Sequence, residues 1–238
     1  MAEMTETAEI KWSTLPLFKK IQIQGSAMTK AHHKYLDKIR IKDVVQSIEP
    51  TLRVARLVKT FTKLEDFIQT DIHPHHILKA HRGSGSVLDL AHTTLNKAHE
   101  SMKSWSVELL RKGIPPEFLI EEKINDAVLG RTGSAVDYKF FCFHGEPRFF
   151  LRRYKNNRHF YYPDWTPIKH EGSVHIPQID ISSMIEAVRK LSAPFPFVRI
   201  DLYHGNDGIY FGEYTFHVCQ GKQEFNMETE LRFGAFWC

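Results

Sequence analysis

The chain has 238 residues, of which 42% are hydrophobic and 25% are charged, a composition typical of a globular protein without a disorder signature. Its formal net charge of +4 is too modest, and its basic residues too dispersed, to indicate a nucleic-acid binder. Three cysteines without CxxC spacing indicate reduced thiols and a cytoplasmic protein. The acidic N-terminus has no signal core, and no apolar run approaches the ~18 residues of a transmembrane helix.

The first half of the chain predicts helices that alternate with short strands. Residues 1–30 show little periodicity and are expected to form a tail or a docking arm. The following residues predict a helix over 31–49, a β-branched run over 52–61, a short helix over 63–69, strands over 77–80 and 86–90, and an amphipathic helix over 92–111.

The second half predicts more strands. They comprise a strand over 117–124, a loop over 125–133 and a β-hairpin over 136–155 with its turn at 144–147. A loop rich in Tyr, Pro and Asp leads to a helix over 181–192, with Ser182 or Ser183 as its N-cap. Strand pairs that alternate with helices indicate an α+β protein with mixed or antiparallel sheets.

The most informative stretch is FVRIDLYHGNDGIYFGEYTF, residues 197–216, which predicts two strands around an Asn-Asp-Gly turn. Arg199 and Asp201 share one strand face, and Glu213 and Thr215 share a face of the next strand. In a tight hairpin the four polar groups converge. Carboxylate and hydroxyl oxygens beside a guanidinium suit Mg²⁺ bound to a polyphosphate.

Further polar positions suit a nucleotide phosphate. Lys79 ends a strand and is followed by the glycine-rich loop Gly83-Ser84-Gly85, which can close over phosphates, although it is not a Walker P-loop. Glu121 and Glu122 lie on a strand that leads into a loop, where backbone groups can read an adenine edge. Asp137 and Lys139 share a strand face.

The order of these motifs resembles the ATP-grasp superfamily and, more closely, the TupA-like ATP-grasp family, named for teichuronopeptide synthesis. The phrases that carry the resemblance are ILKAHRGSG (77–85), DYKFFCFHGEPRFF (137–150), FYYPDW (160–165), FPFVRIDLY (195–203) and YFGEYTF (210–216). It implies an α+β ATP-grasp fold, with two lobes of mixed or antiparallel sheets that clasp ATP. The implied regions are an N-terminal arm and helical region (1–60), a central lobe with the Gly-Ser lid (61–124) and a C-terminal lobe with the Mg²⁺-ATP site (125–238).

The resemblance also implies a role for each motif residue. Lys79 would bind the α- and β-phosphates, and Gly83, Ser84 and Gly85 would form the lid. Glu121 and the backbone near Lys123 and Ile124 would hold adenine, Asp137 the ribose, and Lys139 the phosphates. Asp201, Glu213 and Thr215 would bind Mg²⁺, and Arg199 would stabilise the transferring phosphoryl group and then the tetrahedral oxyanion. Two departures from the superfamily stand out, because Thr215 replaces the usual final Asn and the N-terminal region is reduced to about 60 residues.

The implied activity is an ATP-dependent, ADP-forming carboxylate–amine ligase of cell-surface polysaccharide or peptide-polymer biosynthesis. It would join an amino acid or amine to a uronic-acid or glutamyl carboxylate. Arg152 and Arg153 belong to a basic run that is either a solvated face or an anchor for the carboxylate substrate. A phosphotransferase on the same scaffold and a non-catalytic nucleotide-binding protein stay open, and the short N-terminal region is compatible with a homodimer or a partner subunit.

Overall fold

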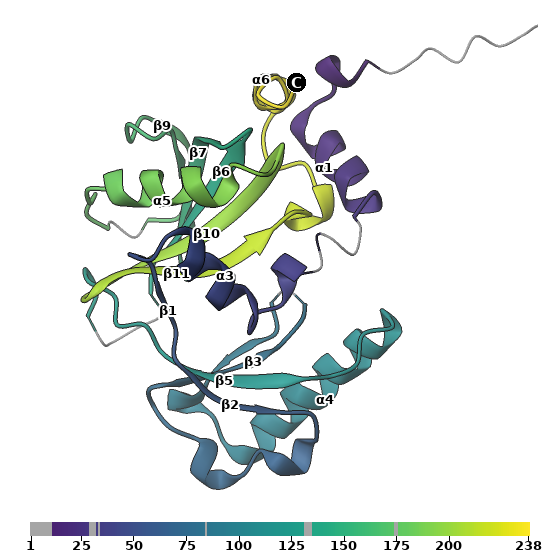
Figure 1. Ribbon diagram of the computed structural model, residues 1–238, viewed down its shortest axis with the longest axis vertical. Coiled ribbons are helices and arrows are strands. Elements are labelled where there is room, and N and C mark those ends of the chain that lie inside the picture. The colour runs from purple at the N-terminus through teal and green to yellow at the C-terminus, as the bar shows by residue number, and fades with distance from the viewer. Residues whose placement is uncertain (1–10, 29–31, 33, 84, 131–134, 174–175) are drawn as a thin grey trace, which may run out of the picture.

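The computed structural model describes residues 11–28, 32, 34–83, 85–130, 135–173 and 176–238. It divides into two lobes, each built on a β-sheet (Figure 1). The large sheet has the strand order β1-β11-β10-β6-β7-β8-β9, and the small sheet has the order β2-β5-β3-β4. Within the described ranges, the strand pairs are antiparallel except for β1 with β11, which is parallel. The predicted α+β architecture with mixed and antiparallel sheets is therefore confirmed.

The large sheet is built mostly from the second half of the chain. Its strands are β1 (Arg53–Val54), β6 (Asp137–Phe143), β7 (Glu146–Tyr154), β8 (Asn157–Tyr161), β9 (Pro167–Glu171), β10 (Phe197–Gly205) and β11 (Gly208–Thr215). The hairpins predicted over 136–155 and 197–216 are confirmed. The loop expected after residue 155 is wrong in part, because β8 and β9 extend the sheet there: Phe160 and Tyr161 are buried and gain apolar neighbours by pairing with β7.

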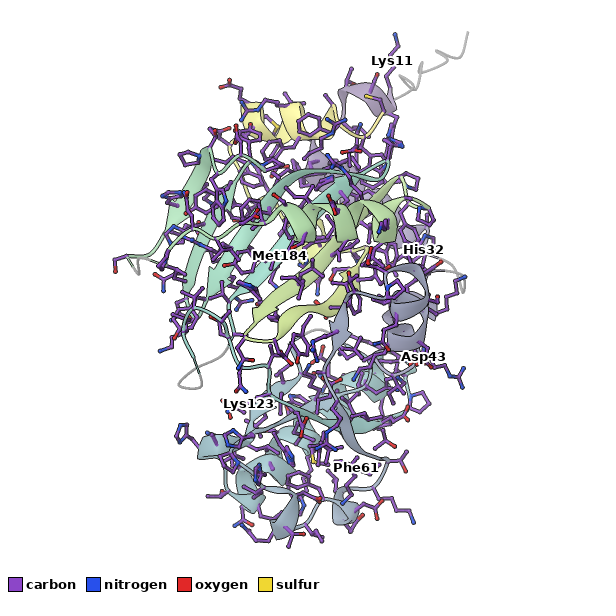
Figure 2. The ribbon with its side chains drawn as sticks, turned by 60° about the vertical axis from the view of Figure 1, so that its left-hand side comes forward. Lys11, His32, Asp43, Phe61, Lys123 and Met184 are labelled. Carbon is purple, nitrogen blue, oxygen red and sulfur yellow. The ribbon has the colours of Figure 1, made fainter. Side chains whose placement is uncertain are left out.

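Helices cover both faces of the large sheet. On one face, α3 (Ile41–Ile48) and α5 (Ser182–Ser192) pack against the strands, and Figure 2 shows Met184 of α5 over the sheet. On the other face lie α1 (Leu17–Ser26) and α6 (Met227–Gly234). These two helices lie side by side although they come from opposite ends of the chain (Figure 1).

The small sheet carries α4 on one face. Its strands are β2 (Leu57–Phe61), β3 (His76–Ala80), β4 (Val87–Asp89) and β5 (Phe118–Glu122), and α4 spans Leu95–Arg111. Ala98, Met102 and Leu109 of α4 pack against Leu78 and Phe118, in the core that also contains Phe61 (Figure 2). Because side chains alternate along a strand, Ile77 and Lys79 point away from α4.

Several short turns complete the chain. They are the 3-10 segments η1 (Trp12–Thr14), η2 (Lys34–Leu36), η3 (Leu64–Asp66), η4 (Gln69–Asp71), η5 (Leu90–His92) and η6 (Val218–Gly221). None of the helices in the described ranges is both long and apolar enough to cross a membrane.

Three predicted elements can be compared with the structure. Of the two forms expected for residues 1–30, a tail or a docking arm, the described part agrees with the docking arm, because α1 buries Leu17 and Ile21 against the large sheet. The helix expected over 31–49 is reduced to α3, which follows η2; residues 31 and 33 lie outside the described ranges. The side chains of Ser182 and Ser183 do not cap α5. Asp180 does so instead, accepting hydrogen bonds from the backbone N–H and hydroxyl of Ser182.

Candidate functional site

The hairpin of β10 and β11 brings its four polar side chains together as the sequence predicts. Asp201 pairs with Glu213 across the strands, and Arg199 pairs with Thr215. Arg199 donates to both oxygens of Asp201, at 2.7 and 2.8 Å, to Glu213 Oε1 at 3.0 Å and to Thr215 Oγ1 at 2.9 Å. The predicted convergence is confirmed, and the guanidinium lies at its centre.

The next strand adds Lys139 and Asp137 to the same face. Lys139 pairs with Asp201, and Asp137 lies two residues earlier on β6. The Lys139 ammonium lies 2.5 Å from Asp201 Oδ2 and 3.2 Å from Asp137 Oδ2. Asp137 Oδ1 is buried without a hydrogen-bond partner in the described structure. A buried carboxylate oxygen of this kind is costly, and a donor on a bound molecule, such as a ribose hydroxyl, would satisfy it.

Burial and mutual attraction set the charges of this large-sheet cluster (Asp137, Lys139, Arg199, Asp201 and Glu213). Burial alone would raise the pKa of Asp201, but Arg199 and Lys139 outweigh it and lower this pKa below its ordinary value. Burial alone would lower the pKa of Lys139, but Asp201 and Asp137 outweigh it and raise that pKa. The attraction between Asp201 and its two cationic neighbours therefore keeps both Asp201 and Lys139 in their charged forms near neutrality.

Lys79 and Glu121 face the large lobe from the small sheet. Ile77 pairs with Glu121 on adjacent strands, and Lys79 lies two residues further along β3 on the same face. Lys79 Nζ lies 2.6 Å from Glu121 Oε2. Lys42 of α3 binds the other oxygen of this carboxylate. Burial alone would raise the pKa of Glu121, but Lys79 and Lys42 lower it overall.

Lys38 lies between the two sheets. Its ammonium donates to the backbone carbonyls of Ala80 and Gly83, at 3.0 and 2.8 Å, and so fixes the start of the glycine-rich loop. Burial lowers the pKa of Lys38, while the carboxylates of Glu213 and Glu121 act in the opposite direction. Glu213 belongs to the large lobe and Glu121 to the small one, so Lys38 is close enough to be influenced by both.

Two described residues of the predicted lid are glycines in the left-handed region. Gly83 has a φ of 102° and Gly85 a φ of 81°, which side chains with a Cβ rarely adopt. Ser84, the third predicted lid residue, lies outside the described ranges. At the base of this loop, His81 Nε2 lies 2.8 Å from Asp37 Oδ1, which ties the loop to the segment before α3.

The predicted adenine-binding segment lies where the lobes meet, as the position of Lys123 in Figure 2 shows. The backbone N–H of Lys123 donates to the carbonyl of His75 at 2.7 Å, and its side chain pairs with Asp89. In the described part of the chain, neither backbone group of Ile124 has a hydrogen-bond partner. Ile124 therefore offers a donor and an acceptor that a base edge can use.

The structure separates the two predicted substrate arginines. Arg153 pairs with Asp137, so it shares the face of the site and is exposed. Arg152 pairs with Tyr138 on the opposite face, where it is 4% exposed. There its Nη1 donates to the carbonyl of Ile176 at 2.9 Å. Consecutive strand residues point to opposite faces, so the structure does not place Arg152 with the other site residues.

Lys38 and Lys42 were not predicted as site residues. Their i, i+4 spacing within the segment read as a helix was the only sequence signal, and it is as common on solvated helices. Tyr203, also not predicted, lies on the site face opposite Asp137. Burial raises the pKa of Tyr203 well above its ordinary value, and the neighbouring carboxylates of Asp137 and Asp201 raise it further. Its hydroxyl therefore stays protonated beside these carboxylates.

The fit of Mg²⁺ can be judged from the donors. No group of three or more His, Cys, Asp or Glu side chains forms a metal site by itself among the described residues. Asp201 and Glu213 nevertheless offer hard carboxylate oxygens, and Mg²⁺ often needs only one or two of these beside substrate phosphates. Among the described residues, Arg199 and Thr215 engage Oε1 of Glu213 and none engages Oε2, and the side chain is 34% exposed. These residues fit Mg²⁺ that arrives with a polyphosphate.

A family model described as TupA-like ATPgrasp matches residues 19–237. The comparison with curated proteins gives no match. Among solved structures, the D-cycloserine synthetase DcsG aligns at 14% identity over 97% of this chain and 86% of its own, with a TM-score of 0.49. The ATP-grasp ligase PsnB, complexed with a minimal precursor, aligns at 13% identity over 84% of this chain, with a TM-score of 0.46. The D-alanine–D-alanine ligase from Bacillus anthracis aligns at 15% identity over 77% of this chain, with a TM-score of 0.42. The present chain spans 56% of the length of each of the last two proteins.

Proposed function

The chain belongs to the TupA-like ATP-grasp family, and from this premise we propose that it is an ATP-dependent, ADP-forming carboxylate–amine ligase. The observation that carries the proposal is the pairing of two charge clusters across the lobes. The small-sheet cluster (Lys38, Lys42, Lys79 and Glu121) has three ammonium groups and one carboxylate. The large-sheet cluster has three carboxylates and two cations. The net positive small-sheet cluster suits the triphosphate, and the net negative large-sheet cluster suits the Mg²⁺ that the triphosphate carries.

In this proposal the small-sheet cluster binds the phosphates. Lys79 supplies a point charge for them, and Lys38 both neutralises charge and fixes the loop at Gly83. The carboxylate of Glu121 is engaged by two lysines. We therefore assign it the positioning of Lys79, and we assign the adenine contact to the backbone at Ile124. Asp137 would accept a ribose hydroxyl at its unpartnered Oδ1.

The large-sheet cluster would hold the metal and the reacting groups. Asp201 and Glu213, with Thr215, would bind Mg²⁺, which when bound neutralises phosphate charge and orients the terminal phosphate. Arg199 has Nε and Nη2 engaged, while its Nη1 has no acceptor among the described residues. Nη1 would therefore donate to the transferring phosphoryl group, and Lys139 would lie beside it.

The proposed reaction has two steps. An oxygen of the substrate carboxylate attacks the γ-phosphorus, and the bond to the bridging oxygen of ADP breaks, which gives an acyl phosphate. The amine nitrogen then attacks the acyl carbon, inorganic phosphate leaves with the C–O bond electrons, and the nitrogen loses a proton. Positioning and charge neutralisation supply most of the catalysis of such transfers. The loop at Gly83 and Gly85 would close over the site and exclude water from the intermediate.

We place this activity in cell-surface polysaccharide or peptide-polymer biosynthesis, because the sequence resembles a family named for teichuronopeptide synthesis. The enzyme itself would act in the cytoplasm.

The proposal is tested by measuring release of ADP and inorganic phosphate from Mg²⁺-ATP with a panel of carboxylates and amines. A ligase releases the two products in equal amounts, and only when an acid and an amine are both present. ADP without phosphate would instead identify a phosphotransferase, and nucleotide binding without turnover by any pair would identify a non-catalytic protein.

A further inference from the structure

A cavity adjoins Arg199 on the site face of the large sheet. It is a small hollow that is partly open to solvent. Its floor includes Phe141, Leu151 and Phe160 of the sheet, and its roof includes Phe18 and Ile21 of α1 and Val218 of η6. We call it the α1 pocket. None of the roles assigned above uses it.

The strand register places this pocket directly beside the charged cluster. Asp201 pairs with Lys139, Lys139 pairs with Leu151, and Leu151 pairs with Phe160. These four side chains therefore form one row across the sheet, with neighbours roughly 5 Å apart. The row changes from charged to apolar between Lys139 and Leu151. A molecule whose charged end lies at Lys139 and Arg199 must place its next few atoms against apolar side chains.

Most of the other charged groups around the pocket are paired within the protein, while the exposed Lys222 also lines it. Arg158 donates to Glu224 at 2.6 Å and to Glu171 at 3.2 Å. Glu230 is 1% exposed and accepts hydrogen bonds from the backbone N–H groups of Phe18, Glu224 and Phe225. These pairs hold α1 and the segment after η6 in place. On the sheet itself, Nη1 of Arg199 is a donor that no acceptor among the described residues engages.

The roof is shaped by an unusual turn. Cys219 and Gln220 have φ values of 48° and 56°, a left-handed conformation that non-glycine residues rarely adopt. Two glutamines of α1 hold this segment: Gln22 donates to the carbonyl of Gly221 at 2.9 Å, and Gln24 donates to that of Phe216 at 2.8 Å. The turn places exposed Cys219 at the edge of the pocket.

We propose that the α1 pocket binds the body of the carboxylate substrate, and that this acid carries an apolar side chain. The inference rests on the proposed function and narrows it. The carboxylate lies at Arg199, where it meets the γ-phosphate, and the side chain lies against Leu151, Phe160 and the α1 roof. A uronic acid fits poorly, because most of its ring hydroxyls would lose water against Leu151, Phe160 and the apolar side chains of the α1 roof.

The thiol of Cys219 reports on the occupancy of the pocket without any turnover. In a Cys238→Ser protein, Cys219 is the exposed cysteine and Cys142 is buried. The experiment measures the rate of its alkylation by iodoacetamide with a non-hydrolysable ATP analogue and Mg²⁺. 3-Phenylpropionate and 4-methylpentanoate should slow the reaction at least tenfold, and glucuronate should leave it unchanged. Equal protection by glucuronate, or none by either apolar acid, would overturn the proposal.

A variant of the roof gives an independent test. Phe18→Ala removes part of the pocket wall from a half-buried position of α1, and the matched control Ile23→Ala removes a 48% exposed side chain from the same helix. Phe18→Ala should weaken protection of Cys219 by the apolar acids at least tenfold, while affinity for the ATP analogue and protection in Ile23→Ala stay at the parent values. An unchanged Phe18→Ala protein would contradict the assignment. If protection is observed but no acid supports ADP release, the ligase proposal fails while the binding site stands.

Discussion

Lys42 of α3 and Glu121 of β5 form an ion pair that joins the two lobes, although 79 residues separate them in the sequence. Their side chains are only 14% and 5% exposed. The same carboxylate holds Lys79 at 2.6 Å. A helix that packs on the large sheet is thereby linked, through one buried carboxylate, to the lysine proposed to bind the phosphates.

Glu121→Gln should weaken ATP binding. The substitution removes the charge shared by Lys42 and Lys79 and leaves two ammonium groups close together, so Lys79 loses its fixed position. We expect the KM for ATP to rise at least tenfold and stability to fall by about 3 kcal/mol. Steady-state kinetics and chemical denaturation measure the two effects.

Glu122→Gln is the matched control, because the neighbouring residue pairs with Arg56 on the surface, with side chains 42% and 67% exposed. Exposed pairs contribute little to stability, because water screens them. Kinetics in this variant should match the parent protein. A larger effect from Glu122→Gln than from Glu121→Gln would refute the positioning role.

The two proposed metal ligands should differ in their structural consequences. Glu213→Gln removes a carboxylate whose side chain is 34% exposed, so ADP formation should fall at least 100-fold with little change in melting temperature. Asp201→Asn should lose both activity and about 3 kcal/mol of stability, because Arg199 and Lys139 keep their buried charges without a carboxylate partner. Asp207→Asn, in the hairpin turn, is the activity control. Full activity in Glu213→Gln would exclude it as a metal ligand.

Acid should destabilise the protein through the same carboxylates. The pKa values of Asp201 and Glu121 are lowered on folding from ordinary values of 3.8 and 4.5. The unfolded chain therefore binds protons at a higher pH than the folded chain. The stabilisation is fully present well above these ordinary values and is lost as the pH falls through the lower folded values. Chemical denaturation measured between pH 3 and pH 7 gives the free energy of unfolding at each pH. This free energy should change less with pH in Asp201→Asn than in the parent protein.

Arg152 and Arg153 should separate stability from activity. Arg152→Met leaves the buried carbonyl of Ile176 without its donor, and stability should fall by about 2 kcal/mol. Arg153→Met changes an exposed side chain on the site face, so it should leave the melting temperature unchanged and raise the KM of the carboxylate substrate. An unaltered KM would remove Arg153 from the substrate site.

Lys38→Met tests the link between the N-terminal segment and the glycine-rich loop. Without the ammonium, the carbonyls of Ala80 and Gly83 lose their donor and the phosphates lose one positive charge. We expect a KM for ATP at least tenfold higher, whereas Lys34→Met, at an exposed position, should behave like the parent protein. Equal kinetics in both variants would show that Lys38 does not contact the nucleotide.

The sequence alone determined the local parts of this protein. Alternation along two strands and an Asn-Asp-Gly turn are local properties, and they were enough to predict the convergence of Arg199, Asp201, Glu213 and Thr215. The order of several such phrases was enough to predict the family, which the match over residues 19–237 confirms. The separate roles of the site residues stay predictions.

Only the tertiary structure decided which residues from distant segments meet. The pairing of Lys42 with Glu121, and the contact of Lys38 with the loop at Gly83, depend on how α3 and the small sheet pack together. The burial of α1 depends on α6 at the far end of the chain. The local sequence pattern does not show such contacts, because long-range packing sets them. A lysine that binds a distant carboxylate has the same sequence neighbours as a lysine that lies in water.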